Sequence, residues 1–154
     1  MKIKDAPLRV RITAVLYAVL MIWLLFGQRL GYTRMSYGEY FSKNVIVTPF
    51  RTVARFIGVL RRGEGGYWAL HAFVNLAGNV VMFIPLGIFA AMFDGKGDSF
   101  WRCMVRCAAV IAAVELMQLV TMLGTFDIDD LILNTAGAAM GYLLYRLHGY
   151  KRKS

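Results

Sequence analysis

"WALHAFVNLAGNVVMFIPLGIFAAMF", Trp68 to Phe93, is the stretch that decides the fold, because it contains no Asp, Glu, Lys or Arg. A bilayer core about 30 Å thick needs roughly 20 apolar residues of helix, so this stretch is long enough to cross it. Pro85 lies inside it, where we expect a kink or a local break in helical hydrogen bonding. The whole chain is similarly apolar, with 58% hydrophobic and 18% charged residues among 154, which indicates a membrane protein.

Three further apolar stretches, about residues 10–27, 103–123 and 128–147, are predicted to cross the membrane alongside residues 68–93. The first follows a basic N-terminal segment and precedes "GQRLGYTR", which lacks a small-residue cleavage pattern, so we interpret it as an uncleaved helix. We therefore predict an all-α integral membrane fold. It is a four-transmembrane-helix bundle that forms a single domain over residues 1–154.

The net charge of +9 indicates partners of negative charge. Lys and Arg lie at the ends of apolar stretches and in one loop, without a soluble basic domain, so we expect membrane lipids as partners and no nucleic acid. The basic flank of the first predicted helix places the N-terminus in the cytoplasm. Four spans would return the C-terminus to the same side.

The segment "TPFRTVARFIGVLRR", Thr48 to Arg62, has the pattern of an amphipathic interfacial helix between the first two spans, over about residues 49–62. We expect Thr48 as its N-cap and Pro49 at its first position. Apolar residues recur at helical spacing, and three arginines that we predict to contact lipid headgroups occupy another face: Arg51, Arg55 and Arg62. The alternative is a solvated loop with incidental periodicity.

Polar side chains are costly in hydrocarbon and usually face a protein interior or a water-filled cavity. They form three stripes at helical spacing: His71, Asn75 and Asn79; Glu115 and Gln118; and Asp127, Asp130 and Asn134, the last continuing into Gly137 and Gly141. The Gly137-x-x-x-Gly141 spacing predicts that this helix packs closely on a neighbouring helix. With cytoplasmic termini, all three stripes fall in the outer half of the membrane. We predict that they form a ligand-binding pocket open to the outside, lined by Asn75, Asn79, Glu115, Gln118, Asp127, Asp130 and Asn134.

Structural explanations remain open for several of these residues. Asn75 and Asn79 could be interhelical hydrogen-bonding groups, and Asp127 and Asp129 could be solvated residues at a helix N-terminus. His71 lies near the interface and is more simply explained as structural. An isolated Glu115 at mid-helix would raise the free energy of membrane insertion by about 2.5 to 3.5 kcal/mol, which implies that it has a partner or access to water.

Two cysteines and three carboxylates are the side chains to consider for catalysis or metal binding. Cys103 and Cys107 are i,i+4 within an apolar run, so we interpret them as core residues. Glu115, Asp127 and Asp130 are the candidates for general acid and base, and their oxygens suit a divalent cation. No nucleophile elbow, metal-binding His pair or phosphate loop accompanies them, so no catalytic residue, metal site or cofactor is established.

Several blocks resemble signature blocks of the VanZ-like family: "NLAGNVVMFIPLG" (Asn75 to Gly87), "ELMQ" (Glu115 to Gln118) and "FDIDDLILNTAGAAMG" (Phe126 to Gly141). "NVIVTPFRT" (Asn44 to Thr52) resembles the short Pro-Phe block that precedes them. The positions that match are Asn79, Pro85, Glu115, Gln118, Asp127, Asp130, Asn134 and Gly137. Many relatives have an Arg just before the Phe-Asp block, where this chain has Thr125.

The resemblance implies a multi-pass protein of the bacterial cytoplasmic membrane, whose founding member accompanies glycopeptide resistance and gives low-level teicoplanin resistance. We therefore expect a cell-envelope protein that lowers susceptibility to lipoglycopeptides. It would bind a lipid-linked peptidoglycan precursor or the glycopeptide antibiotic, or alter envelope lipids. The alternatives are a membrane-embedded enzyme acting on a lipid-linked substrate and a structural partner subunit. The sequence does not determine the oligomeric state.

Overall fold

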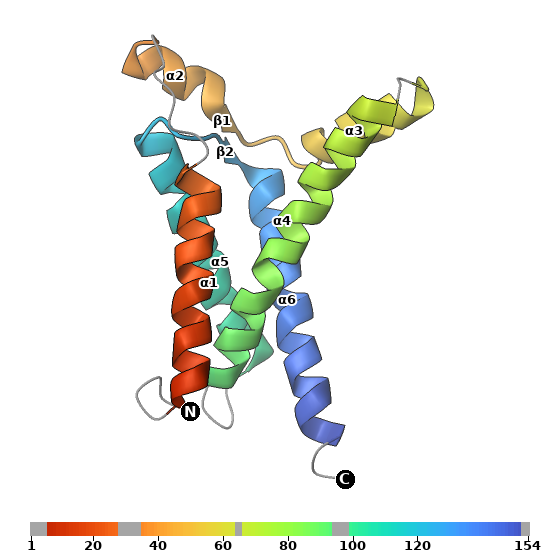
Figure 1. Cartoon of the computed structure of the whole chain (residues 1–154). Coiled ribbons are helices and arrows are strands. Elements are labelled where there is room, and N and C mark those ends of the chain that lie inside the picture. Colours follow the sequence, from red (N-terminus) through yellow and green to blue (C-terminus); the bar gives the residue numbers. More distant parts are fainter. Residues whose placement is uncertain (1–5, 28–34, 64–65, 94–98, 152–154) are drawn as a thin grey trace.

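A computed structural model describes residues 6–27, 35–63, 66–93 and 99–151 of the chain. This part contains six helices and two very short strands, which confirms the predicted helical class (Figure 1). In chain order they are α1 (Leu8–Phe26), α2 (Tyr37–Asn44), β1 (Val45–Ile46), α3 (Arg51–Arg61), α4 (Gly66–Phe93), α5 (Phe100–Val120), β2 (Phe126–Asp127) and α6 (Ile128–Lys151).

Three helices, α1, α4 and α5, are long and apolar enough to cross a membrane, so the chain is a multi-pass membrane protein. Helix α6 has 24 residues, enough for about 36 Å at 1.5 Å per residue. It is less apolar than the other three because Asp129 and Asp130 lie in its first turn and Arg146 lies near its end. The four-span bundle therefore stays a prediction with respect to α6.

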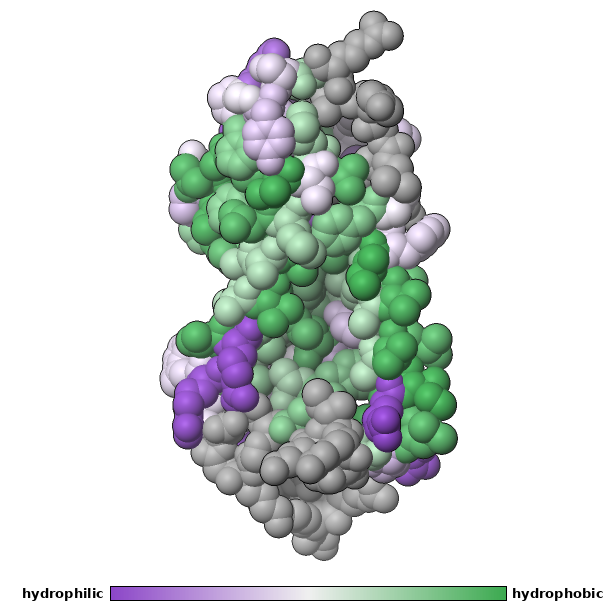
Figure 2. Space-filling view, turned by 90° about the vertical axis from the view of Figure 1, so that its left-hand side faces the viewer, coloured by the Kyte–Doolittle hydropathy of each residue, from purple (hydrophilic) through white to green (hydrophobic). Residues whose placement is uncertain are grey.

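The long helices alternate in direction. Helices α1 and α5 run one way and α4 and α6 the other, so α1 begins and α6 ends at the same end of the molecule (Figure 1). The opposite end carries α2, the two strands and α3. Figure 2 shows hydrophobic residues in a band across the middle of one face, with hydrophilic residues toward both ends, as expected for a protein that crosses a bilayer.

Helices α4 and α6 touch through their backbones. A Cβ atom built on Gly137 or Gly141 of α6 would lie closer than 3.0 Å to the carbonyl groups of Val80 and Ile84 of α4, respectively. Gly87 of α4 faces the backbone of Ala138 in the same way. This confirms the close packing predicted from the Gly137-x-x-x-Gly141 pattern, in which small residues let two membrane helices approach.

The buried apolar residues form two clusters between the long helices. One joins α4, α5 and α6 and contains Cys103 and Cys107, which are 1% and 3% exposed, so their interpretation as core residues is confirmed. The other joins α1, α4 and α5 through Met21, Phe83 and Ile111. Most of the remaining surface of α1 is exposed and apolar, which suits contact with lipid tails.

The expected interruption at Pro85 does not break α4, which continues as one helix from Gly66 to Phe93. Proline removes the N–H that would bond to the carbonyl four residues earlier, at Val81. The Tyr17 hydroxyl of α1 donates a hydrogen bond of 2.9 Å to the next carbonyl, that of Met82. Helix α1 thus supplies a hydrogen-bond donor at the turn that the proline weakens.

Sequence reasoning missed α2 and the strand pair. Helix α2 begins at the N-cap Ser36, and its hydroxyls tie it to the end of α5: Tyr37 donates to the Val120 carbonyl and Tyr40 to the Gly124 carbonyl, each at 2.7 Å. Strands β1 and β2 are parallel, with Val45 opposite Phe126. These contacts hold the segment between the first two spans over the ends of α5 and α6.

Candidate functional site

Asp129 joins α3 to α6. Its carboxylate accepts hydrogen bonds from the backbone N–H groups of Phe50, at 2.5 Å, and Thr52, at 2.7 Å, and the residue is 1% exposed. Those groups lie at the start of α3, where helix N–H donors lack partners within the helix. A carboxylate of α6 therefore caps the N-terminus of α3, a favourable place for negative charge.

Asp127 completes this contact. One of its carboxylate oxygens accepts from the N–H of Asp129 at 2.9 Å, and the other accepts from the Thr52 hydroxyl at 3.2 Å. Asp127 is 6% exposed, so the alternative of solvated loop residues is wrong for both aspartates. We call Phe50, Thr52, Asp127 and Asp129 the carboxylate clasp.

The predicted start of α3 needs a correction. Helix α3 begins at Arg51, with Phe50 as its N-cap, and neither Thr48 nor Pro49 has the role we expected. Phe50 adopts a left-handed conformation with φ of 61°, which is unusual for a bulky residue. This turn directs the N–H groups of Phe50 and Thr52 to one carboxylate, so the cap comes from α6 rather than from the neighbouring sequence.

A second group of polar residues lies between the long helices. The Asn79 side-chain amide of α4 donates a hydrogen bond to the Asp130 carboxylate of α6. Asn134 of α6 is 2% exposed, and its side-chain oxygen has no hydrogen-bond partner among the described residues. Glu115 of α5 is 4% exposed. The predicted stripes of α4, α5 and α6 thus lie in the same half of the molecule, away from the start of α1.

The Gln118 side chain is directed toward α1. It is 2% exposed, and its side-chain amide donates a hydrogen bond of 2.8 Å to the Leu25 carbonyl in the last turn of α1. The last carbonyls of a helix have no partner within it, and in a membrane each needs another donor. Gln118 therefore fastens α5 to α1.

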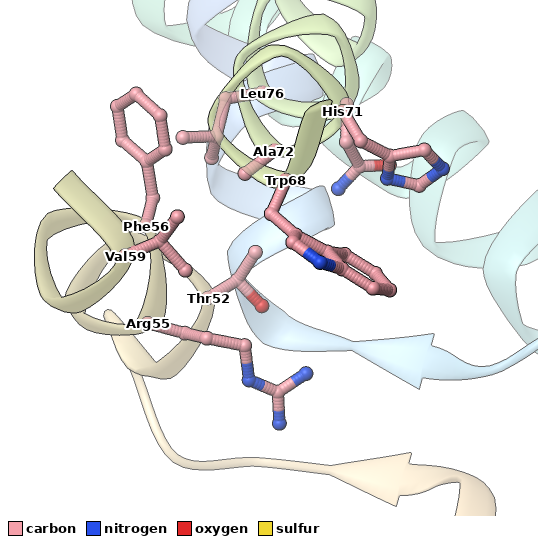
Figure 3. A pocket seen from close by; sticks show the side chains of 9 residues that line it. Thr52, Arg55, Phe56, Val59, Trp68, His71, Ala72 and Leu76 are labelled. Atoms are coloured by element: carbon pink, nitrogen blue, oxygen red, sulfur yellow. The ribbon is translucent and has the colours of Figure 1, made fainter. Parts of the chain in front are cut away.

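A pocket of about 360 Å³ opens between α3 and the first turns of α4. Its lining residues are Thr52, Arg55, Phe56 and Val59 of α3, and Trp68, His71, Ala72, Asn75 and Leu76 of α4. In Figure 3, Phe56, Val59 and Leu76 lie toward the upper left, and the Trp68 indole lies between the Arg55 guanidinium at the bottom and His71 at the upper right. We call this cavity the α3–α4 pocket.

The predicted headgroup arginines are all exposed, and Arg55 lines the α3–α4 pocket whereas Arg51 and Arg62 are not among its lining residues. The pocket lining contains no Asp or Glu. The apolar residues of α3 divide between two surfaces. Phe56 and Val59 face α4, and several others, Phe50, Ile57 and Leu60 among them, are 44% to 62% exposed, as expected for a helix in contact with lipid.

The structure places the predicted ligand-binding residues in separate surroundings. Asn75 lines the α3–α4 pocket, Asn79 bonds Asp130, and Asp127 belongs to the carboxylate clasp. That all seven line one ligand site stays a prediction. Within the described residues, no group of three or more His, Cys, Asp or Glu side chains is placed to hold a metal ion.

Three residues received no site role from the sequence, Thr52, Trp68 and Asp129, and Asp129 was considered only as a solvated residue at a helix N-terminus. One signal for Asp129 was available, because three aspartates occur within four residues and only Asp127 and Asp130 share a helix face. The third carboxylate, in so apolar a chain, needed a partner of its own. No comparable pattern marks Thr52, whose partners lie 75 and 77 residues away.

Comparison with known proteins identifies the family of the chain. The VanZ/LLP1 family matches residues 14–149. Protein VanZ of Enterococcus faecium is 27% identical over 132 residues, which cover 86% of this chain and 70% of that protein. No solved structure shows significant similarity to the chain. The match extends from α1 to α6, so this membrane protein belongs to the VanZ/LLP1 family.

Proposed function

We propose that this protein lowers bacterial susceptibility to lipoglycopeptides such as teicoplanin, by binding an anionic envelope lipid or lipid-linked wall precursor and shielding it. The observation that carries this proposal is the α3–α4 pocket, which combines Arg55, His71 and Asn75 with apolar walls. Lipids and lipid-linked precursors have the same combination, an anionic phosphate joined to an apolar chain. Similarity to Protein VanZ supports a role at the cell envelope.

The proposal includes an orientation. Both termini are cytoplasmic, α6 is the fourth span, and α2, α3 and the α3–α4 pocket face outward. In support, α1 begins and α6 ends at the same end of the molecule (Figure 1), as an even number of crossings requires. The outer side is where wall precursors are used and where a glycopeptide meets the membrane. Cysteine labelling from outside in intact cells would test this, with labels expected near Ser42 and not near His148.

Deletion of the gene tests the function itself. We expect the deletion strain to become several-fold more susceptible to teicoplanin and to recover with the wild-type gene. Susceptibility to a glycopeptide without an acyl chain serves as the control and should change less. Unchanged teicoplanin susceptibility after deletion would rule out the resistance function for this protein.

A second candidate, a structural partner subunit, is favoured by specific contacts. The Asn79–Asp130 and Gln118–Leu25 hydrogen bonds both connect helices. Under this alternative, Glu115→Gln and Asp130→Asn lower the amount of folded protein in the membrane. Under the ligand-binding proposal, Arg55→Gln in the α3–α4 pocket leaves folded protein in normal amount and raises teicoplanin susceptibility. Quantitative immunoblotting of membranes beside susceptibility measurements separates the two.

A further inference from the structure

We propose that the α3–α4 pocket holds one phospholipid with a singly charged phosphodiester headgroup. The phosphate lies at Arg55, and one acyl chain lies along Phe56, Val59 and Leu76. This inference rests on the proposed function and specifies the ligand class of that site. It selects an envelope phospholipid over a lipid-linked diphosphate.

The polar side of the pocket suits a phosphate. The guanidinium of Arg55 presents a planar set of N–H donors that can bind two phosphate oxygens at once. His71 and Asn75 add an imidazole and an amide that can each donate a hydrogen bond. No carboxylate among the lining residues opposes an anion. Arg55 and Trp68 lie on the same side of the pocket in Figure 3.

The apolar side suits a hydrocarbon chain. Phe56 and Val59 of α3 face Ala72 and Leu76 of α4 across the pocket. A volume of about 360 Å³ falls within the range of roughly 300–1,000 Å³ that is common for ligand sites.

The position along the membrane agrees with this ligand. The lining residues of α4 belong to its first three turns, so they lie within about 15 Å of the helix start. Tryptophan favours the boundary between headgroups and acyl chains, and Trp68 is 62% exposed there. A lipid in the pocket can therefore keep its headgroup at the ordinary depth and enter sideways from the bilayer.

The number of cations distinguishes two kinds of lipid phosphate. Arg55 is the one arginine or lysine among the lining residues. One guanidinium balances the single charge of a phosphodiester. A lipid diphosphate carries at least two charges, and a second cation among the lining residues would be needed to balance them. The pocket therefore matches phosphatidylglycerol better than a diphosphate precursor.

Fluorescence of Trp68 provides a direct measurement. The chain contains three tryptophans, so Trp23→Phe and Trp101→Phe together leave Trp68 as the reporter. The purified full chain in neutral detergent is titrated with phosphatidylglycerol carrying brominated acyl chains, which quench nearby tryptophan. We expect saturable quenching with one lipid per protein. Brominated phosphatidylcholine should bind about tenfold more weakly, because its headgroup has no net charge.

Matched variants separate the pocket from general surface charge. Arg55→Gln should weaken phosphatidylglycerol binding about tenfold, whereas Arg61→Gln, an exposed arginine on the same helix outside the pocket, should leave it unchanged. Ala72→Leu, which fills the apolar side, should abolish saturable quenching while circular dichroism shows a normal helical spectrum. Equal losses from Arg55→Gln and Arg61→Gln, or wild-type binding by Ala72→Leu, would overturn the proposal.

Competition identifies the ligand. Unlabelled phosphatidylglycerol should displace the brominated lipid, and inorganic phosphate should not. Stronger displacement by a polyprenyl diphosphate than by phosphatidylglycerol would overturn the choice of a phospholipid. These measurements use purified protein without antibiotic, so they are independent of the deletion experiment. If phospholipid binding is confirmed but deletion leaves teicoplanin susceptibility unchanged, the resistance function is ruled out and the lipid site still stands.

Discussion

Helix α4 makes two contacts of opposite character along its length. Its later turns, from Val80 to Gly87, meet α6 so closely that glycines are required at the contact. Its first turns, from Trp68 to Leu76, face α3 across the α3–α4 pocket. The same helix thus packs tightly against α6 along its later turns and borders the open α3–α4 pocket along its first turns.

The residues explain the difference. At the α4–α6 contact the small residues are Gly87 of α4 and Gly137, Ala138 and Gly141 of α6, which bring the two backbones together and leave no room for another group. Opposite α3 the chain places Trp68, His71 and Leu76, whose size holds the helices apart. Dense packing at the α4–α6 contact provides stability, and it lets the α3–α4 contact remain open without loss of the fold.

The largest expected effect comes from breaking the close contact. Gly137→Leu forces a side chain into the Val80 carbonyl, so α4 and α6 must separate. We expect a loss of about 3 kcal/mol or more in the free energy of unfolding, measured in mixed detergent micelles, and little folded protein in membranes.

Gly78 of α4, the helix that Gly137 approaches, offers the control for that substitution, because a Cβ built there meets nothing within 4 Å. Gly78→Ala should be tolerated where Gly137→Ala is not. Equal stability of these two alanine variants would show that the close α4–α6 approach does not exist in the membrane.

Next in size is the loss of the carboxylate clasp. Asp129→Ala removes the acceptor for two backbone N–H groups of α3 and should cost about 2 kcal/mol. Hydrogen–deuterium exchange should increase in α3, while α4 and α6 stay protected. Glu39→Ala, which removes an exposed carboxylate paired with Lys43, provides the comparison and should change α3 little. Uniform loss of protection in all helices would contradict a local role for Asp129.

A smaller effect is expected at the contact between α5 and α1. Gln118→Leu removes the hydrogen bond to the Leu25 carbonyl, and bonds of this kind in membranes contribute about 0.6 to 1.7 kcal/mol. Equilibrium unfolding measures the change, and Gln118→Glu tests whether the donor is what matters, since it lacks the amide. No change in either variant would mean that other contacts hold α1 in place.

The smallest expected effect comes from filling the α3–α4 pocket, and it tests directly whether the two contacts of α4 differ in packing. Ala72→Leu adds the same side chain as Gly137→Leu, but it adds it at the α3–α4 pocket, where space is present. We expect a change within about 0.5 kcal/mol, measured in the same micelles. A loss as large as that of Gly137→Leu would show that the two contacts of α4 are equally tight.

Local patterns in the sequence were sufficient for the long apolar helices and for the close contact. The long apolar stretches marked α1, α4 and α5, and Gly137-x-x-x-Gly141 marked the approach to α4, because each signal lies within one segment. The start of α3 was predicted wrongly for the opposite reason. Its cap comes from Asp129, far away in the chain, and no local pattern reveals a partner at that distance.

The sequence predicted individual residues of the candidate site but not that they line one cavity. Arg55 was assigned to lipid headgroups and Asn75 to a pocket, and the structure brings both to one cavity with His71, which we had considered structural. Their meeting depends on how α3 folds back against α4. That geometry follows from the carboxylate clasp and the strand pair rather than from the periodicity of either helix.

The carboxylate clasp also determines the order in which parts of the fold form during synthesis. Thr52 and Asp129 are 77 residues apart, and a ribosome adding about 5 to 20 residues per second needs roughly 4 to 15 s to make that interval. During that time α3 lacks the carboxylate that caps it. The pocket between α3 and α4 is therefore completed only after α6 has been made.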